Sequence, residues 1–182
     1  MPPPFAYTDS TTVNTAAEEG AWALTYAIFG GKPVSDADLA TKVGNKDAAK
    51  CQLEMLKRAD RLENTVLKEV NKAKKKALKD ESVDSAAALE ARLQAVFSSN
   101  KRINSARDRL VKRVNRKCSG LQAPDSIFPG YDCGEETPNL SAIAACVIAA
   151  ARCEACSKIN AFDNLNLDCD QADDHVTNGS CP

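Results

Sequence analysis

The fold is decided by residues 46–118, which read KDAAKCQLEMLKRADRLENTVLKEVNKAKKKALKDESVDSAAALEARLQAVFSSNKRINSARDRLVKRVNRKC. No proline occurs in residues 34–123, and no glycine in residues 45–119. Strands and turns rarely extend so far without either residue, because glycine and proline shape the turns between strands. This block is therefore predicted to be helical, and the protein to be all-α.

Apolar residues recur within the block at steps of three and four, the period of an amphipathic helix. The rows are Ala59, Leu62, Val66, Val70, Ala73 and Ala77, then Leu89, Leu93 and Val96, then Ile103, Ala106, Leu110 and Val114. A polar stretch at residues 80–85, rich in capping residues, follows the first row. We expect helices at about 46–79 and 84–118, each roughly 50 Å long, that form an antiparallel hairpin.

Two shorter helices complete the expected four-helix arrangement. The first has capping-box spacing at Thr15 and Glu18 and stops at Gly30. The other begins at Thr137-Pro138 and runs to about Asn160; its apolar stretch 142–151 predicts burial on most sides. A further short helix is expected at about 35–44. The chain is interpreted as one domain, 1–182, with an extended segment at 1–12 and an irregular tail at 161–182.

Eight cysteines predict disulfide bonds and an oxidising compartment, because their number is even and six crowd into the last fifty residues. In a hairpin that turns near residue 82, Cys51 and Cys118 lie within about one helical turn, so we predict a bridge between them. Cys146, Cys153 and Cys156 share one helix and are expected to anchor Cys133, Cys169 and Cys181, with the individual pairing left open. The alternative is a bundle that holds Cu(I) or Zn²⁺ on thiolates.

The start of the chain and its hydropathy bear on localisation. Met1-Pro2-Pro3-Pro4 is not the basic and then apolar start of a signal peptide, so an exported protein would be present here in mature form. No run of 18 apolar residues occurs, which predicts no membrane span. We expect an extracellular, cell-surface or periplasmic protein.

The tail carries alternating oxygen side chains that favour a Ca²⁺ site, since Ca²⁺ takes six to eight oxygen ligands. The candidate ligands are Asn164, Asn166, Asp168, Asp170, Asp173 and Asp174. From Asp168 to Pro182 the pattern Asp-x-Asp, Asp, Asn, Cys-Pro weakly resembles thrombospondin type 3 calcium repeats, although Gln171 replaces their glycine. The alternative interpretation is a solvated acidic loop pinned by Cys169 and Cys181.

Three features of the sequence occur together: long Lys-rich helices, a Phe-Pro-Gly-x-x-Cys loop at 128–133 and an Asp-Cys-Asp-x-x-Asp-Asp sequence at 168–174. This pattern resembles that of uncharacterised exported Cys-rich proteins of δ-proteobacterial type. It covers roughly residues 46–182. The resemblance implies export and implies no activity.

Charge is segregated along the chain. Residues 46–118 hold 20 Lys/Arg and 10 Asp/Glu, whereas both ends are acidic. Nucleic-acid binding is disfavoured because Phe97 is the only aromatic residue of this basic block. No catalytic residues are predicted: His175 is the only histidine, and it has no nucleophile beside it in the sequence.

The expected function is therefore that of a non-enzymatic structural or interaction protein. Its partner would be another extracellular protein or a second copy of the chain, in an oligomer or filament. The N-terminal segment has three prolines and no helical period, so it is expected to dock on a neighbour through Phe5 and Tyr7.

Overall fold

The computed structural model describes residues 5, 7–30, 39–80, 82–121, 127–128, 139–179 and 181. Its helices are α1 (Ser10–Phe29), α2 (Lys46–Lys79), α3 (Ala86–Ser99), α4 (Lys101–Cys118), α6 (Leu140–Asp163) and α7 (Cys169–Asp174). No strand occurs in the described ranges. The all-α prediction is confirmed.

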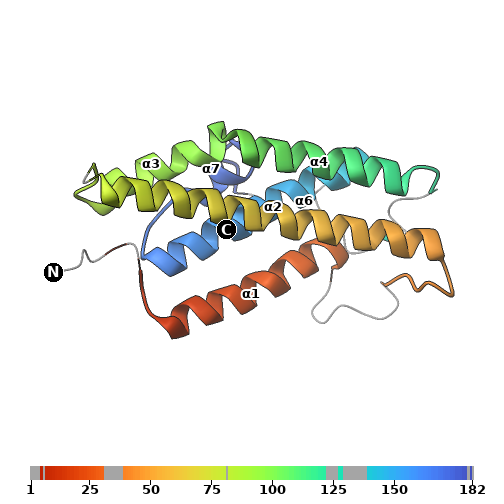
Figure 1. Cartoon of the computed structure of the whole chain (residues 1–182). Helices are drawn as coiled ribbons and strands as arrows, with labels where there is room; N and C mark the ends of the chain where they lie inside the picture. Colours follow the sequence, from red (N-terminus) through yellow and green to blue (C-terminus); the bar gives the residue numbers. More distant parts are fainter. Residues whose placement is uncertain are drawn as a thin grey trace.

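The long hairpin is present, but its second arm is two helices. Figure 1 shows α3 and α4 end to end along α2. The break falls at Asn100, whose backbone N–H donates to the Val96 carbonyl while its side-chain oxygen accepts from the backbone N–H groups of Arg102 and Ile103. Asn100 thus ends α3 and starts α4, because its side chain competes for backbone partners. The predicted single helix 84–118 is corrected accordingly.

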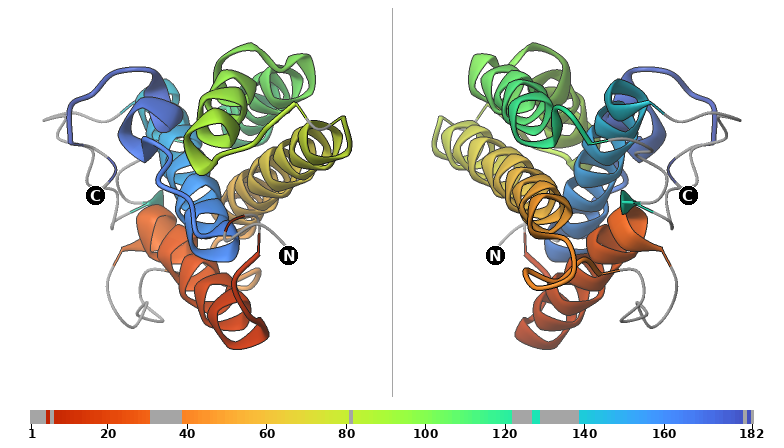
Figure 2. Two further views of the ribbon diagram at one scale, coloured as in Figure 1. Left: turned by 90° about the vertical axis from the view of Figure 1, so that its left-hand side faces the viewer. Right: turned by 90° about the vertical axis from the view of Figure 1, so that its right-hand side faces the viewer.

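Helix α6 lies at the centre and contacts α1, α2, α4 and α7, as Figure 2 shows along the bundle. Its length, and a mean hydropathy of 1.5 over an 18-residue window, would by length and composition alone also suit a membrane span, so the absence of a membrane span stays a prediction. In this structure α6 is the core helix of a bundle. It also carries the buried charged residues Arg152, Lys158 and Asp163.

The core follows the predicted apolar rows. Leu62, Val66, Leu93 and Leu110 are fully buried, as are most other members of these rows. Ala73, Val96 and Ala106 are only partly buried and pack against the core from its edge. The stretch 142–151 of α6 contributes Ile143, Ala144, Val147, Ile148 and Ala151 to the same cluster.

The N-terminal segment differs from its prediction. Helix α1 starts at Ser10, five residues before the expected Thr15, because Asp9 caps it by accepting from the backbone N–H groups of Thr11 and Thr12. Thr8 donates its N–H to the Phe162 carbonyl at 2.8 Å. Phe5 is 7% exposed and belongs to the chain's own core, so its side chain needs no neighbour to cover it. Tyr7 is 65% exposed.

Two further expectations concern segments at the limits of the described residues. The short helix expected at about 35–44 falls mostly on residues 31–38, which lie outside them, and residues 42–44 form a turn. The tail is less irregular than predicted: α6 extends to Asp163, and residues 169–174 form α7. Asp168 starts α7 by accepting the N–H of Gln171. The prediction of an irregular tail did not consider that an Asp residue can cap a helix.

Candidate functional site

Three disulfide bonds between described cysteines join the helices to one another and to the tail. Cys51–Cys118 closes the open end of the hairpin with a Cα–Cα distance of 5.0 Å, which confirms the predicted bridge. The other two are Cys153–Cys181 and Cys156–Cys169, with Cα–Cα distances of 5.6 and 5.4 Å. Cys146 is also disulfide-bonded, whereas Cys133 lies outside the described residues.

The bridges bear on whether Cys153 and Cys156 form structural disulfides or hold Cu(I) or Zn²⁺ as thiolates. These two cysteines face the tail and are each bonded to it, and they are not bonded to each other. No described cysteine is free. In this oxidised state the described cysteines therefore offer no thiolate to Cu(I) or Zn²⁺, since the thiolate is the ligating form.

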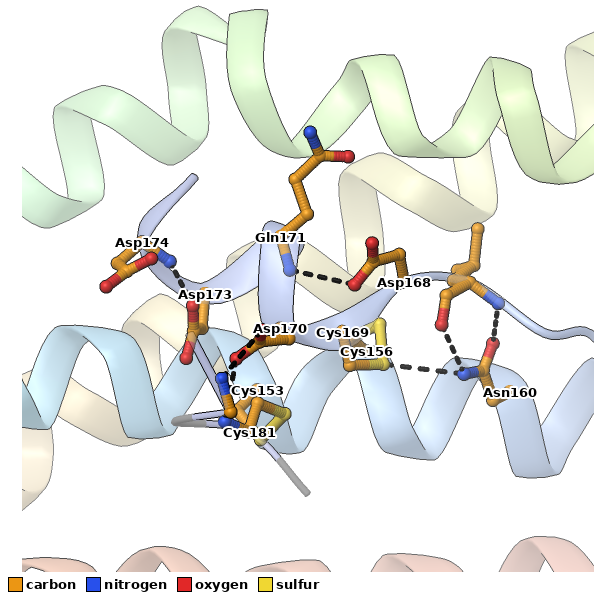
Figure 3. The surroundings of a disulfide bond; sticks show 12 residues. Cys153, Cys156, Asn160, Asp168, Cys169, Asp170, Gln171, Asp173, Asp174 and Cys181 are labelled. Carbon is orange, nitrogen blue, oxygen red and sulfur yellow. Dashed lines mark hydrogen bonds between the residues drawn. A yellow bond between two sulfur atoms is a disulfide. The ribbon is translucent and has the colours of Figure 1, made fainter. Parts of the chain in front are cut away.

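Hydrogen bonds hold the tail on α6 beside the bridges, as Figure 3 shows. The Asn160 side chain donates to the Leu167 carbonyl at 3.0 Å and accepts the Leu167 N–H at 2.8 Å. Asn164 ends α6 in the left-handed conformation. The Asn166 N–H donates to Glu90 of α3 at 2.7 Å. The tail is therefore fixed to two helices as well as cross-linked.

The predicted calcium ligands mostly bind backbone N–H groups. Asp170 accepts from Asn178, Gly179 and Cys181, and Asp174 accepts from Val176. Asp173 is 1% exposed and accepts the N–H of Asp174. Within the described part of the chain, no three His, Cys, Asp or Glu side chains are grouped to hold a metal ion. These contacts account for the acidic tail as a set of caps, and calcium binding stays a prediction.

The substitution Asp170→Ala distinguishes a capping role of Asp170 from a calcium-binding role. The substitution removes acceptors for three N–H groups, so we expect the free energy of unfolding to fall by about 2 kcal/mol. If Asp170 only caps the tail, thermal unfolding shows the same loss in millimolar calcium and in EDTA. If Asp170 binds calcium, the wild type melts at a higher temperature in calcium, and this gain disappears in the variant.

Arg152 is a buried cation between α6, the end of α3 and the tail. It is 3% exposed, and its Nη2 donates to the Phe97 carbonyl at 3.0 Å and lies 3.2 Å from His175 Nε2. Burial, followed by the charge of Arg152, lowers the pKa of His175. The imidazole therefore remains neutral at neutral pH, with Nε2 as the acceptor. His175 is exposed, as the sequence predicts.

A buried charge pair joins α6 to α2. The Lys158 ammonium donates to the Glu63 carboxylate, and the side chains are 8% and 6% exposed. Burial raises the pKa of Glu63, and the bond to Lys158 opposes this effect. Lys158 reaches Glu63 across Gly20 of α1, where a Cβ atom would lie 2.1 Å from Lys158 Cε. Because Gly20 has no side chain, the Lys158 side chain can pass α1 and reach Glu63.

A groove lies directly above this pair, between α1 and α6. It has a volume of about 520 Å³ and is lined by Glu19, Gly20, Trp22, Tyr26, Glu154 and Lys158, among others. Trp22 is 54% exposed and stacks on Tyr26 with ring centroids 5.9 Å apart. A stacked aromatic pair with an exposed tryptophan, beside two carboxylates, can bind apolar or cationic groups.

In the sequence, Trp22, Tyr26 and Phe29 lie at helical spacing, but only Phe29 among them is buried. Lys158 and Arg152 gave no sequence signal of burial. Comparison with known proteins found no matching family model, curated protein or solved structure.

Proposed function

We propose that this chain is an exported, non-enzymatic interaction protein, a structural subunit that binds a second copy of itself through the groove between α1 and α6. The observation that carries the proposal is the stacked Trp22–Tyr26 pair that lines this groove, in which Trp22 is 54% exposed. Exposed tryptophan and tyrosine are enriched where proteins bind each other, because they bury a large area at a small entropic cost.

Cross-linking supports export. Three described bridges connect segments 13 to 67 residues apart, which suits a protein that remains folded in an oxidising extracellular or periplasmic compartment. Such bridges also make the helical surfaces rigid. A rigid surface loses less conformational entropy on binding than a flexible one, so it suits a structural subunit.

Charge supports a second copy as the partner. Glu19 and Glu154 line the groove beside its aromatic pair, and α1 contains no lysine or arginine. The hairpin helices carry the chain's excess positive charge. A contact between the acidic groove of one copy and the basic hairpin of the next joins two different surfaces, and contacts of this kind produce rings or filaments.

Trp22→Ser tests this proposal. We expect the wild type to sediment as an oligomer at high concentration in low salt and to dissociate as salt is raised, because the contact is partly ionic. The variant should remain monomeric at about tenfold higher concentration or more, the usual effect of removing a central tryptophan. Val176→Ser is the matched control, since Val176 is 54% exposed like Trp22 but lies in the tail, outside both the groove and the hairpin helices. A wild type that is monomeric throughout, or equal effects of both variants, would contradict self-association through this groove.

A further inference from the structure

A second groove, between α2 and α4, is lined mostly by cations. Six of its lining residues are cationic, and Glu69 is the one acidic residue: Arg58, Arg61, Lys68, Lys101, Arg102 and Arg109 line it together with Thr65, Ser105 and Ala106. Its volume is about 400 Å³. It shares no lining residue with the groove between α1 and α6.

Most of these cations have no carboxylate partner. Arg58 pairs with Glu54 at 2.7 Å, and Arg102 pairs with Glu69 at 3.1 Å. Arg61, Lys68, Lys101 and Arg109 form no ion pair within the described residues, and all four are exposed. Like charges that face each other across a groove repel, so an anion between them would relieve that repulsion.

The helix dipole strengthens the positive potential at one end. Lys101 and Arg102 occupy the first turn of α4, a helix of 18 residues. Cations are unfavourable at a helix N-terminus, where the dipole is positive. The first turn of α4 therefore carries cations that the helix dipole destabilises. A bound anion would offset both the charge of these cations and the positive end of the dipole.

The two cationic rows have a fixed geometry. Arg61 and Lys68 are seven residues apart on α2, so they lie on one side of that helix, and Lys101 and Arg109 lie similarly on α4. The Arg102–Glu69 contact joins the two helices at one end of the groove, and the Cys51–Cys118 bridge joins them beyond the other. From Arg58 to Lys68 the groove extends about 15 Å at 1.5 Å per residue. The packing of α2 and α4 therefore fixes the cations along a line before any ligand binds.

The lining also narrows the chemistry of the ligand. It contains no aromatic ring on which a nucleic-acid base could stack, although stacking supplies much of the affinity for single strands. Thr65 and Ser105 provide hydroxyl groups, which hydrogen-bond to sugars and to anionic oxygens. Arginine forks match the geometry of planar carboxylates and tetrahedral oxyanions. The disulfides fit a compartment in which acidic carbohydrate polymers are exposed.

We propose that the α2–α4 groove binds a linear acidic polysaccharide through two or three of its sulfate or carboxylate groups. The cations contact the anionic groups, and the two hydroxyl side chains contact the sugar. Neither self-association nor the groove between α1 and α6 is needed for this binding.

The test measures the affinity of the intact, oxidised protein for a heparin hexasaccharide by calorimetry, at several salt concentrations. The groove variant is Arg61→Ala/Lys68→Ala/Arg109→Ala, and the matched control is Lys75→Ala/Lys112→Ala/Arg116→Ala, whose three residues are exposed and lie outside the groove. We expect the groove variant to lose about 30-fold or more in affinity and two to three units of salt slope, and the control to lose less than about threefold.

Three results would overturn the proposal: no binding by the wild type, equal losses in both triple variants, or tighter binding of single-stranded DNA of the same charge. Circular dichroism of each variant checks that the helices are intact. Trp22→Ser is measured in parallel, because a loss of self-association in this variant with unchanged hexasaccharide binding shows that the two grooves act separately.

Discussion

Replacing Cys51 and Cys118 together with alanine is expected to lower the free energy of unfolding by about 4 kcal/mol, the largest effect of any described bridge. The reason is loop length: this bridge closes 67 residues, whereas the other two close 28 and 13. A longer loop gains more conformational entropy in the unfolded chain when its bridge is removed. Both cysteines are also buried, so each substitution removes packing as well.

Urea unfolding measures this loss, and Cys156→Ala/Cys169→Ala is its matched control. The control removes a bridge of 13 residues and is expected to cost about 3 kcal/mol. For a chain of this size the hairpin variant should also melt roughly 10 °C lower than the wild type. A hairpin variant as stable as the wild type would show that packing alone holds α2 and α4 together.

Lys158→Met is expected to cost about 3 to 5 kcal/mol, because it leaves the Glu63 carboxylate buried without its cation. Adding Glu63→Met should restore most of the loss, since two apolar side chains of similar length replace the pair. The matched control is Lys50→Met, whose partner Asp47 is 70% exposed and whose loss should be below about 1 kcal/mol. If the double variant is no more stable than Lys158→Met, lost packing and not an unpaired charge is the cause.

The loss of stability caused by Lys158→Met is expected to depend on pH, because the substitution leaves the Glu63 carboxyl without its cation. Burial raises the pKa of this carboxyl above its ordinary value of 4.5, and removing Lys158 removes the opposing effect. In the folded state Glu63 keeps its proton to a higher pH than in the unfolded state. Its contribution to the free energy of unfolding is therefore complete below the unfolded pKa and is lost as pH rises through the folded pKa. Urea midpoints should therefore show the smallest cost below pH 4.5, and a cost that increases as the pH rises through the raised pKa of Glu63. A cost that is independent of pH would contradict an ionised, unpaired Glu63.

The hairpin and its bridge could be predicted because their signals are local and repeated. The apolar rows of 59–114 persist at one period, and the absence of glycine and proline leaves no alternative to helix. The turn near residue 82 then fixes which residues face each other, which brings Cys51 to Cys118. The break at Asn100 was missed because the apolar rows continue past it, although Ser98-Ser99-Asn100 is a run of capping residues.

The buried charges and the grooves could not be predicted, because they depend on how helices far apart in sequence pack. Lys158 and Glu63 are 95 residues apart, and nothing near either residue indicates the other. Phe5 was assigned to a neighbour because its own segment has no period, yet it packs into the core while Thr8 binds the end of α6. The cationic residues were visible as a basic block, but only the side-by-side packing of α2 and α4 turns them into two rows.

The central claim is that this is an oxidised helical scaffold whose tail is cross-linked to α6, and a non-reducing peptide map tests it most directly. Trypsin leaves Cys153 and Cys156 in one peptide and Cys169 and Cys181 in another, so further cleavage after Glu154 and before Asp170 is needed to separate them. The structure predicts that Cys153 is recovered with Cys181 and Cys156 with Cys169. Recovery of Cys153 joined to Cys156, or alkylation of these cysteines in unfolded but unreduced protein, would contradict the account.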